Sequence, residues 1–225
     1  MKTLFPARAT RLLSLLPVLG LVACTASSAA VALPDPAMDT PLAKTKGTAT
    51  VVLAGGCFWG IEAVYEHMKG VTEAVSGYAG GTADSANYDK VSSGTTGHAE
   101  AVRITYDPSQ VTYGQILKVF FSVAHDPTQL NRQGPDVGTQ YRSALFYAND
   151  EQKKVAQAYM TQLQAAKAYR APIVTELAPL KAFYAAEAYH QDYAARNPTQ
   201  PYIMMHDLPK VANLQKQFPE LYVRR

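Results

Sequence analysis

The stretch Gly55-Gly56-Cys57-Phe58-Trp59-Gly60 lies between two different hydrophobic patterns. Residues 51–54 before it form an apolar run typical of a buried strand, whereas apolar side chains after it recur at helical spacing as far as Met68. We therefore expect Cys57 where a strand ends and a helix begins. Helix N–H groups and the helix dipole lower the pKa of a thiol at such a position, and the glycines leave the sulfur approachable. Cys57 is thus a candidate nucleophile; the alternative is a buried cysteine that packs as a small hydrophobe.

The rest of the chain continues to alternate strand and helix patterns. Thr112 with Gln115 forms a predicted capping box, and Asn149 with Gln152 marks another helix start. The element order indicates a ferredoxin-like two-layer α/β (α+β) sandwich, with a mixed or antiparallel sheet, flanking helices and long active-site loops. The expected strands are 48–54, 71–78, 98–106, 143–147 and 172–177, the expected helices are 57–69, 112–121, 149–163, 180–196 and 208–218, and the longest polar loops are 82–96 and 125–138.

The composition indicates a globular protein with a substantial core and no basic binding surface. Of the 225 residues, 48% are hydrophobic and 17% are charged, unlike a disordered chain. The formal net charge of +3 comes from Lys2, Arg8 and Arg11, and without them 18 basic residues balance 18 acidic ones. A nearly neutral body argues against a nucleic-acid partner. No apolar stripe is left over once the core is assigned, so we expect a monomer.

The N-terminal segment has the pattern of an export signal. Basic residues lead into an apolar run, 12–23, that is too short to span a membrane comfortably. The run ends Leu21-Val22-Ala23-Cys24, which resembles the lipobox of bacterial lipoproteins; the alternative is an ordinary cleavage site within 27–32. With lipid on Cys24, the protein would be exported, periplasmic and anchored to a membrane. We expect an export signal at 1–23, a flexible linker at 24–47 and a folded domain at 48–225.

The cysteine count restricts the chemistry of the folded domain. Cys24 and Cys57 are the only two cysteines, and processing accounts for the first. The domain therefore has no internal disulfide and no cysteine-rich metal site, and we expect neither a metal nor another cofactor. A leftover thiol in an exported protein is more often reactive than structural.

A set of motifs in fixed order, from residue 48 to the C-terminus, resembles that of the A-type peptide methionine sulfoxide reductases. The stretch around Cys57 is similar to the active-site signature of that family. One such stretch would be moderately specific, whereas the whole ordered set is very specific. The further matching stretches are Gly77-Tyr78-Ala79-Gly80-Gly81, Asn87-Tyr88, Thr96-Gly97-His98-Ala99-Glu100, His125-Asp126-Pro127-Thr128, Asn131-Arg132-Gln133-Gly134, Asp136-Val137-Gly138-Thr139-Gln140-Tyr141-Arg142-Ser143 and Tyr189-His190-Gln191.

The resemblance implies reduction of methionine S-sulfoxide in proteins and peptides to methionine, which repairs oxidised proteins. The nucleophile would be left as a sulfenic acid. The family roles would fall on Cys57 as the nucleophile, Glu100 as the acid that protonates the departing oxygen, Tyr88 and Tyr141 as hydrogen-bond donors to that oxygen, Asp136 as a carboxylate that orders the site, and Phe58 and Trp59 as the walls of the methyl pocket.

Each of these roles is chemically sensible for the residue type. A sulfoxide oxygen leaves poorly until it is protonated, so an acid has to face the thiol. Apolar neighbours in the strand around Glu100 favour the burial that keeps a carboxyl group protonated near neutral pH. Phenols donate hydrogen bonds to a developing oxyanion without ionising, and aromatic walls suit a thioether.

The chain departs from many family members because it has no cysteine after Cys57. The corresponding C-terminal stretch is Gln200-Pro201-Tyr202-Ile203-Met204-Met205-His206. The chain therefore resembles the single-cysteine subset, in which an external thiol would reduce the sulfenic acid. A thioredoxin-like exported protein and a small thiol are both open as the reductant; small thiols are scarce in an oxidising compartment.

Simpler interpretations remain for the same residues. Glu100 alone would suit a solvated strand position, the two tyrosines could serve packing, and Asp136 could serve turn geometry. His98 and His190 raise the alternative of a Cys–His acyl-transfer enzyme, although the resemblance assigns neither of them a role as base. A further alternative is a non-catalytic lipoprotein that binds methionine-containing peptides.

Overall fold

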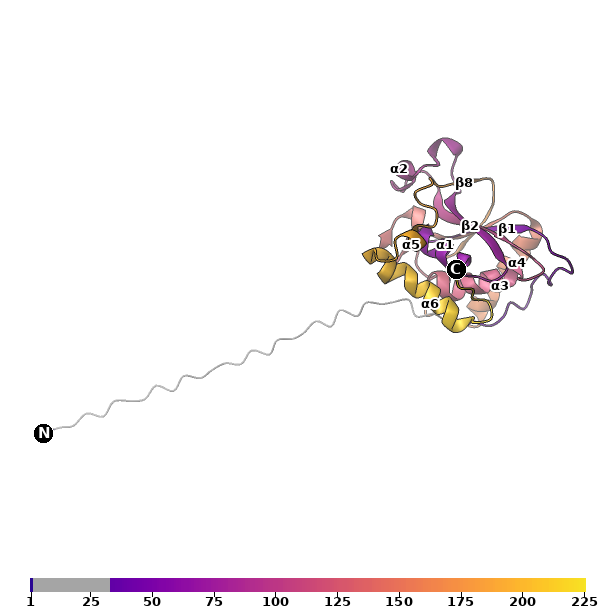
Figure 1. The fold of residues 1–225 in the computed structure, drawn as a ribbon. Helices are drawn as coiled ribbons and strands as arrows, with labels where there is room; N and C mark the ends of the chain where they lie inside the picture. The colour runs from indigo at the N-terminus through magenta and orange to yellow at the C-terminus, as the bar shows by residue number, and fades with distance from the viewer. Residues whose placement is uncertain (2–32) are drawn as a thin grey trace.

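Six strands form one mixed sheet in the part of the chain that the structure describes, which is Met1 and residues 33–225 of a computed structural model (Figure 1). The strand order across the sheet is β7-β6-β1-β3-β2-β8, in which β6 and β7 are parallel and the other neighbours antiparallel. The strands of this sheet are β1 (Ala49–Gly55), β2 (Val71–Ala79), β3 (Ala99–Tyr106), β6 (Ser143–Tyr147), β7 (Glu176–Pro179) and β8 (Phe183–Ala185), and a small hairpin pairs β4 (Arg132–Gln133) with β5 (Asp136–Val137).

Helices pack against this sheet to form the main core. Along β1, Val51 and Leu53 face this core, whereas Val52 and Ala54 face a second cluster on the opposite side of the sheet. Figure 1 shows α6 running beside α1, which it contacts. The helices are α1 (Phe58–Glu66), α2 (Tyr88–Val91), α3 (Tyr113–Val119), α4 (Asp150–Ala165), α5 (Tyr193–Arg196) and α6 (Leu208–Gln217), with 3-10 turns at Ala83–Ser85 and Thr139–Tyr141 and π turns at Phe120–Ala124 and Ile203–Asp207.

The central unit is β1-α1-β2-β3-α3-β6 with the sheet order β6-β1-β3-β2, and β7 and β8 extend the two edges. This confirms the expected mixed sheet with flanking helices in a ferredoxin-like arrangement. The predicted caps are also present. The side chain of Thr112 accepts from the N–H of Gln115, whose own side chain accepts from the N–H of Thr112, and the Asn149 side chain accepts from the N–H of Gln152 at 2.9 Å.

The region after α4 differs from the sequence prediction. The strand expected at 172–177 lies at β7, and the helix expected at 180–196 is wrong: this region contains β8 and the short α5 instead. The cause is tertiary packing, which overrides local helix propensity. Gly77 of β2 has no side chain, so the Phe183 ring and the Tyr184 carbonyl of β8 occupy the space a Cβ would need, 2.3 and 2.4 Å from its position.

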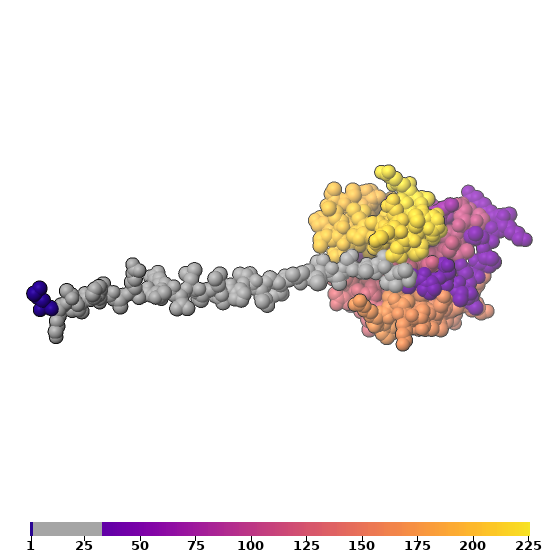
Figure 2. Space-filling view, turned by 90° about the horizontal axis from the view of Figure 1, so that it is seen from below, coloured from indigo at the N-terminus to yellow at the C-terminus, as the bar shows by residue number. Residues whose placement is uncertain are grey.

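Residues 33–47, expected to belong to a flexible linker, contain no helix or strand but are held against the domain (Figure 2). Leu33 is buried in the core, and Tyr159 of α4 donates a hydrogen bond to the Pro34 carbonyl. Asp39 accepts from the backbone N–H of Gly114 at 2.7 Å and from the Thr112 hydroxyl, both at the start of α3. The stretch thus binds to α3 and α4 as far as Thr40, whereas residues 41–47 are exposed.

Two further expectations concern the membrane. The export signal at 1–23 and the lipid-bearing Cys24 lie outside the described residues. Within the described part of the chain, none of the helices combines the length and apolar character that a membrane crossing requires.

Candidate active site

Cys57 lies at the N-cap of α1, directly after β1, as the sequence predicts. Gly56 before it has φ of 99°, a backbone conformation that favours glycine, and the Gln133 side chain lies 2.6 Å from where a Cβ on Gly56 would be. The turn therefore both requires a glycine and brings the loop around β4 close to the thiol. Cys57 itself is buried, with 7% of its surface exposed.

A cavity of about 220 Å³ opens on Cys57, and we name it the substrate cavity. Every site residue suggested by the sequence lies on its wall, although these residues come from α1, α2, β3, β5 and the 3-10 turn before β6. Two more lining residues, Gln200 and Tyr202, belong to the C-terminal region. The lining consists of Cys57, Phe58, Trp59, Tyr88, Glu100, Asp136, Tyr141, Gln200 and Tyr202.

Glu100 is the buried acid of this cavity. It sits in β3 opposite Tyr78 of β2, with 2% of its surface exposed, and its Oε2 accepts the backbone N–H of Phe58 at 3.1 Å. Burial raises the pKa of Glu100 to about 8; the Phe58 N–H opposes this shift, and the carboxylates of Asp136 and Asp207 add to it. The carboxyl group is therefore mostly protonated at pH 7, with Oε1 free to carry the proton.

The thiol departs from the sequence prediction in one respect. Burial raises the pKa of Cys57 well above its ordinary value, and nearby Glu100 and Asp207 raise it further. The backbone N–H of Trp59 and the ammonium of Lys210 lower the pKa, but they do not offset the burial. Cys57 is therefore a neutral thiol at pH 7, not the thiolate that its helix N-terminus predicts. Since Glu100 is largely neutral at pH 7, its negative charge adds little to the Cys57 pKa at that pH.

Two tyrosines from separate segments of the chain line the cavity. Tyr88 begins α2, where its backbone N–H donates to Glu187 Oε1 at 2.9 Å, and Tyr141 ends the Thr139–Tyr141 turn. Burial raises the pKa of both phenols, and the charge of Glu100 is the second cause in each. Both therefore remain hydrogen-bond donors across the range in which Glu100 titrates.

The aromatic wall is held by its own contacts. Trp59 stacks on Tyr193 with ring centroids 3.8 Å apart, and its indole N–H donates to His190 Nδ1 at 3.2 Å. Phe58 packs against His190 at 5.1 Å between centroids. Because Nδ1 of His190 accepts from the indole and burial lowers the His190 pKa, this imidazole is neutral and positions Trp59.

The other histidine raised by the sequence is also used structurally. His98 Nδ1 accepts from the N–H of Gly81, and its Nε2 lies 3.0 Å from the Thr82 carbonyl. Neither His98 nor His190 lines the substrate cavity. The arrangement gives no support to a Cys–His acyl-transfer site.

Tyr202 is a lining residue of the cavity that sequence reasoning missed. Its hydroxyl donates to Asp136 Oδ2, which joins the C-terminal region to the loop around β5. Burial raises the Tyr202 pKa, followed by the charges of Cys57 and Asp136, so the phenol stays protonated. The one available signal was its place in the stretch 200–206, where the resolving cysteines of relatives would be expected.

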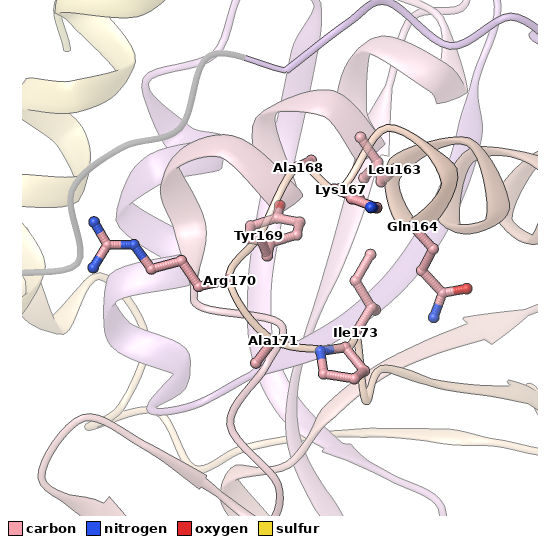
Figure 3. A pocket seen from close by; sticks show the side chains of 9 residues that line it. Leu163, Gln164, Lys167, Ala168, Tyr169, Arg170, Ala171 and Ile173 are labelled. Atoms are coloured by element: carbon pink, nitrogen blue, oxygen red, sulfur yellow. The ribbon is translucent and has the colours of Figure 1, made fainter.

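A larger hollow of about 380 Å³ lies elsewhere, at the end of α4 and in the loop that follows (Figure 3). Among the residues that line it, the ionisable ones are Lys167, Tyr169 and Arg170. The Tyr169 hydroxyl is already engaged, since it donates to the Phe121 carbonyl at 2.7 Å. Chemistry rather than volume therefore identifies the site. Among the described residues, no group of three or more His, Cys, Asp or Glu is placed to hold a metal ion.

Known proteins resemble the chain over its whole folded part. The profile of the peptide methionine sulfoxide reductase family (PMSR) matches residues 49–222. A peptide methionine sulfoxide reductase MsrA 2 of Mesorhizobium japonicum is 62% identical over 78% of this chain and 90% of its own length, and one of Synechocystis is 53% identical over 84% and 89%.

Solved structures agree with the sequence comparisons. Reduced Mxr1 of Saccharomyces cerevisiae superposes with a TM-score of 0.62 at 33% identity, covering 74% of this chain and 98% of that one. Methionine sulfoxide reductase A of Corynebacterium diphtheriae gives 0.58 at 37% identity, covering 70% and 78%. The chain belongs to the peptide methionine sulfoxide reductase family.

Proposed function

We propose that this oxidoreductase reduces methionine S-sulfoxide in peptides and proteins at Cys57, with Glu100 as the acid. The observation that carries the proposal is the substrate cavity, where a thiol, a buried protonated carboxyl group and two phenols share one aromatic-walled space of about 220 Å³. Phe58 and Trp59 would hold the substrate methyl group, and Tyr88 and Tyr141 would donate to the sulfoxide oxygen.

Because the Cys57 thiol and the Glu100 carboxyl group are both neutral, the proton transfers of the reaction balance. Glu100 gives its proton to the sulfoxide oxygen while Cys57 Sγ attacks the sulfoxide sulfur, and the carboxylate so formed takes up the thiol proton. Transfer of the protonated oxygen to Sγ releases methionine and leaves Cys57 as a sulfenic acid. The raised pKa suits Glu100 to both proton transfers, because its carboxyl group donates a proton to the sulfoxide oxygen and its carboxylate then accepts the thiol proton.

The surroundings of the reaction are part of the same proposal. The sulfenic acid is reduced by an external thiol, either a thioredoxin-like exported protein or a small thiol. The basic and apolar leader at 1–23 and the lipobox-like stretch ending at Cys24 support an exported, periplasmic, membrane-anchored protein. We also propose a monomer. Mass spectrometry of the mature N-terminus tests the lipid, and light scattering tests the monomer.

The test of the activity is an epimer-resolved assay with a dithiol reductant. Wild type and Cys57→Ser are incubated with each sulfoxide epimer of a methionyl peptide. The proposal predicts methionine from the S epimer alone and none from the variant. Binding of the peptide without turnover would favour a non-catalytic module, and cleavage of an ester or amide would favour an acyl-transfer enzyme.

A further inference from the structure

Cys57 is reached from a second side, through a hollow that is separate from the substrate cavity. This second opening, of about 80 Å³, lies between the loop around β4 and the C-terminal region. Its lining is mostly polar and includes Gln133, Met205, His206, Lys210 and Asn213.

The two hollows share a hydrogen-bonded pair of lining residues. Both are lined by Cys57, Asp136 and Tyr202, and the Tyr202 hydroxyl donates to Asp136. Glu100 and Tyr141 line only the substrate cavity. Cys57 therefore borders an acidic, aromatic cavity and a more polar opening, and both are lined by the Tyr202–Asp136 pair.

The two sides match a requirement of the second half of the reaction, which rests on the proposed function. The oxygen that Cys57 receives comes from a sulfoxide held beside Glu100 and Tyr141, so the S–O bond of the sulfenic acid points into the substrate cavity. A thiolate displaces the leaving oxygen by attacking the sulfur from behind that bond, in line with it. The second opening also borders Cys57 but is not lined by Glu100 or Tyr141, so it offers a route to the sulfur that avoids the groups holding the oxygen.

We propose that the reducing thiol reaches oxidised Cys57 through the second opening, while the substrate cavity holds the leaving oxygen. The opening is too small for a folded chain but suits the tip of a thiol side chain. Lys210 is one of the lining residues, and its Nζ donates to Asp207 Oδ1 at 3.2 Å; its positive charge favours an approaching thiolate.

The chemistry balances with two thiols as the reductant. The first thiolate forms an S–S bond to Cys57 as the S–O bond breaks, and the departing hydroxide takes a proton from Glu100 to leave as water. The second thiolate attacks the outer sulfur of this mixed disulfide and releases the Cys57 thiolate, which is reprotonated. The net change is one sulfenic acid and two thiols converted to one thiol, one disulfide and one water.

The test separates the two half-reactions in the full chain. The oxidative half is a single turnover of reduced enzyme with a methionine sulfoxide peptide and no thiol, read as methionine formed. The reductive half mixes the resulting sulfenic enzyme with dithiothreitol, or in a second arm with a reduced thioredoxin, and is read as loss of reactivity toward dimedone. Met205→Trp fills the opening; its control, Met204→Trp, changes an exposed neighbour that does not line it.

A second pair covers the case in which the new indole turns into solvent. Asn213 is a half-buried residue of α6 that lines the opening, so Asn213→Phe narrows it. Ala212→Phe is the control, because Ala212 does not line the opening. The expected result is about tenfold or slower reduction in Met205→Trp or Asn213→Phe with both reductants, at an unchanged oxidative half, and no change in either control.

Other results overturn the proposal. Equal loss in both half-reactions, or an unchanged reductive half in both filling variants, would mean that the thiol does not use this route. Slowing with thioredoxin alone would indicate a protein contact at the rim rather than a path for the thiol. Failure of the wild type to form methionine in the oxidative half would instead refute the proposed function itself.

Discussion

The two hollows that meet at Cys57 differ in the charge state they favour. The substrate cavity surrounds the sulfur with aromatic rings and a buried carboxyl group, and burial there raises the pKa of both Cys57 and Glu100. The second opening is lined by amide, imidazole and ammonium groups, together with Asp136 and Tyr202, which it shares with the substrate cavity. Desolvation that keeps an acid protonated also disfavours an incoming thiolate. One sulfur can therefore serve both sulfoxide reduction, which needs a protonated acid, and attack by a thiolate, which needs a polar approach, if each step uses a different hollow.

The largest expected effect is on the cavity side. Glu100→Gln keeps the size of the side chain but removes the acid, so the single-turnover rate of methionine formation falls by about 10²- to 10⁴-fold. Reduction by dithiothreitol of sulfenic enzyme made with peroxide should slow as well, because Glu100 also protonates the departing hydroxide in that step. The matched control is Glu62→Gln, because Glu62 is another buried carboxyl group, with a pKa raised to about 7, that lies outside the cavity. A similar loss in Glu62→Gln would contradict the assignment.

The pH dependence sharpens the same contrast. The oxidative half should fall as pH rises through about 8, where Glu100 loses its proton. Folded Glu100 titrates above an unfolded glutamate, so folding retains a proton that the unfolded chain releases. The free energy of unfolding therefore declines between pH ~4.5 and ~8. Glu100→Gln removes that slope and is expected to be more stable than wild type by about 1–3 kcal/mol at pH 7.

Urea unfolding at pH 5 and pH 7 measures this. A gain in Glu100→Gln that is no larger at pH 7 than at pH 5 would show that Glu100 is already ionised in the folded protein at neutral pH.

Smaller effects are expected from the phenols. Tyr141→Phe removes one donor to the sulfoxide oxygen, and because Tyr88 remains, the oxidative half should slow by about tenfold. The double variant with Tyr88→Phe should lose more than the product of the single effects. Rapid-quench measurement of methionine formation gives both values. Tyr147→Phe, a tyrosine of β6 outside the cavity, is the control; an unchanged rate in the double variant would remove the phenols from the mechanism.

The smallest effect is on the polar side. Lys210→Met removes a positive charge from the second opening, so reduction by an anionic thiol such as mercaptoethanesulfonate should slow by about threefold, and less at high salt. A neutral thiol should respond less. Since the change leaves Asp207 buried without its cation, the double variant with Asp207→Asn controls for lost stability. Slowing that is independent of thiol charge and of salt would contradict an electrostatic role.

How much the sequence predicts depends on how local each feature is. The β1–α1 junction at Cys57 and the caps at Thr112 and Asn149 were predictable because hydrophobic period and capping residues act within a few positions. The prediction of a helix at 180–196 was wrong because Gly77, about a hundred residues away, leaves space for the Phe183 ring at the edge of the sheet.

The candidate site divides in the same way. Its residue types could be inferred from ordered motifs, but the pKa of Cys57 could not, since burial by distant segments outweighs the helix N-terminus. The contribution of Tyr202 and the second opening depends on how the C-terminal region packs over α1 and the loop around β4. No local pattern marks that packing.

The most direct measurement is the mass of the Cys57 peptide after one turnover without reductant. Reduced enzyme is mixed with a peptide carrying S-sulfoxide, quenched and digested. We expect one methionine per enzyme and a sulfenic acid on Cys57, read as one dimedone adduct on the Cys57 peptide, because dimedone bonds to the sulfur and releases the oxygen as water. Methionine formed with Cys57 unmodified, or an equal yield from Cys57→Ser, would show that the oxygen does not pass to this sulfur.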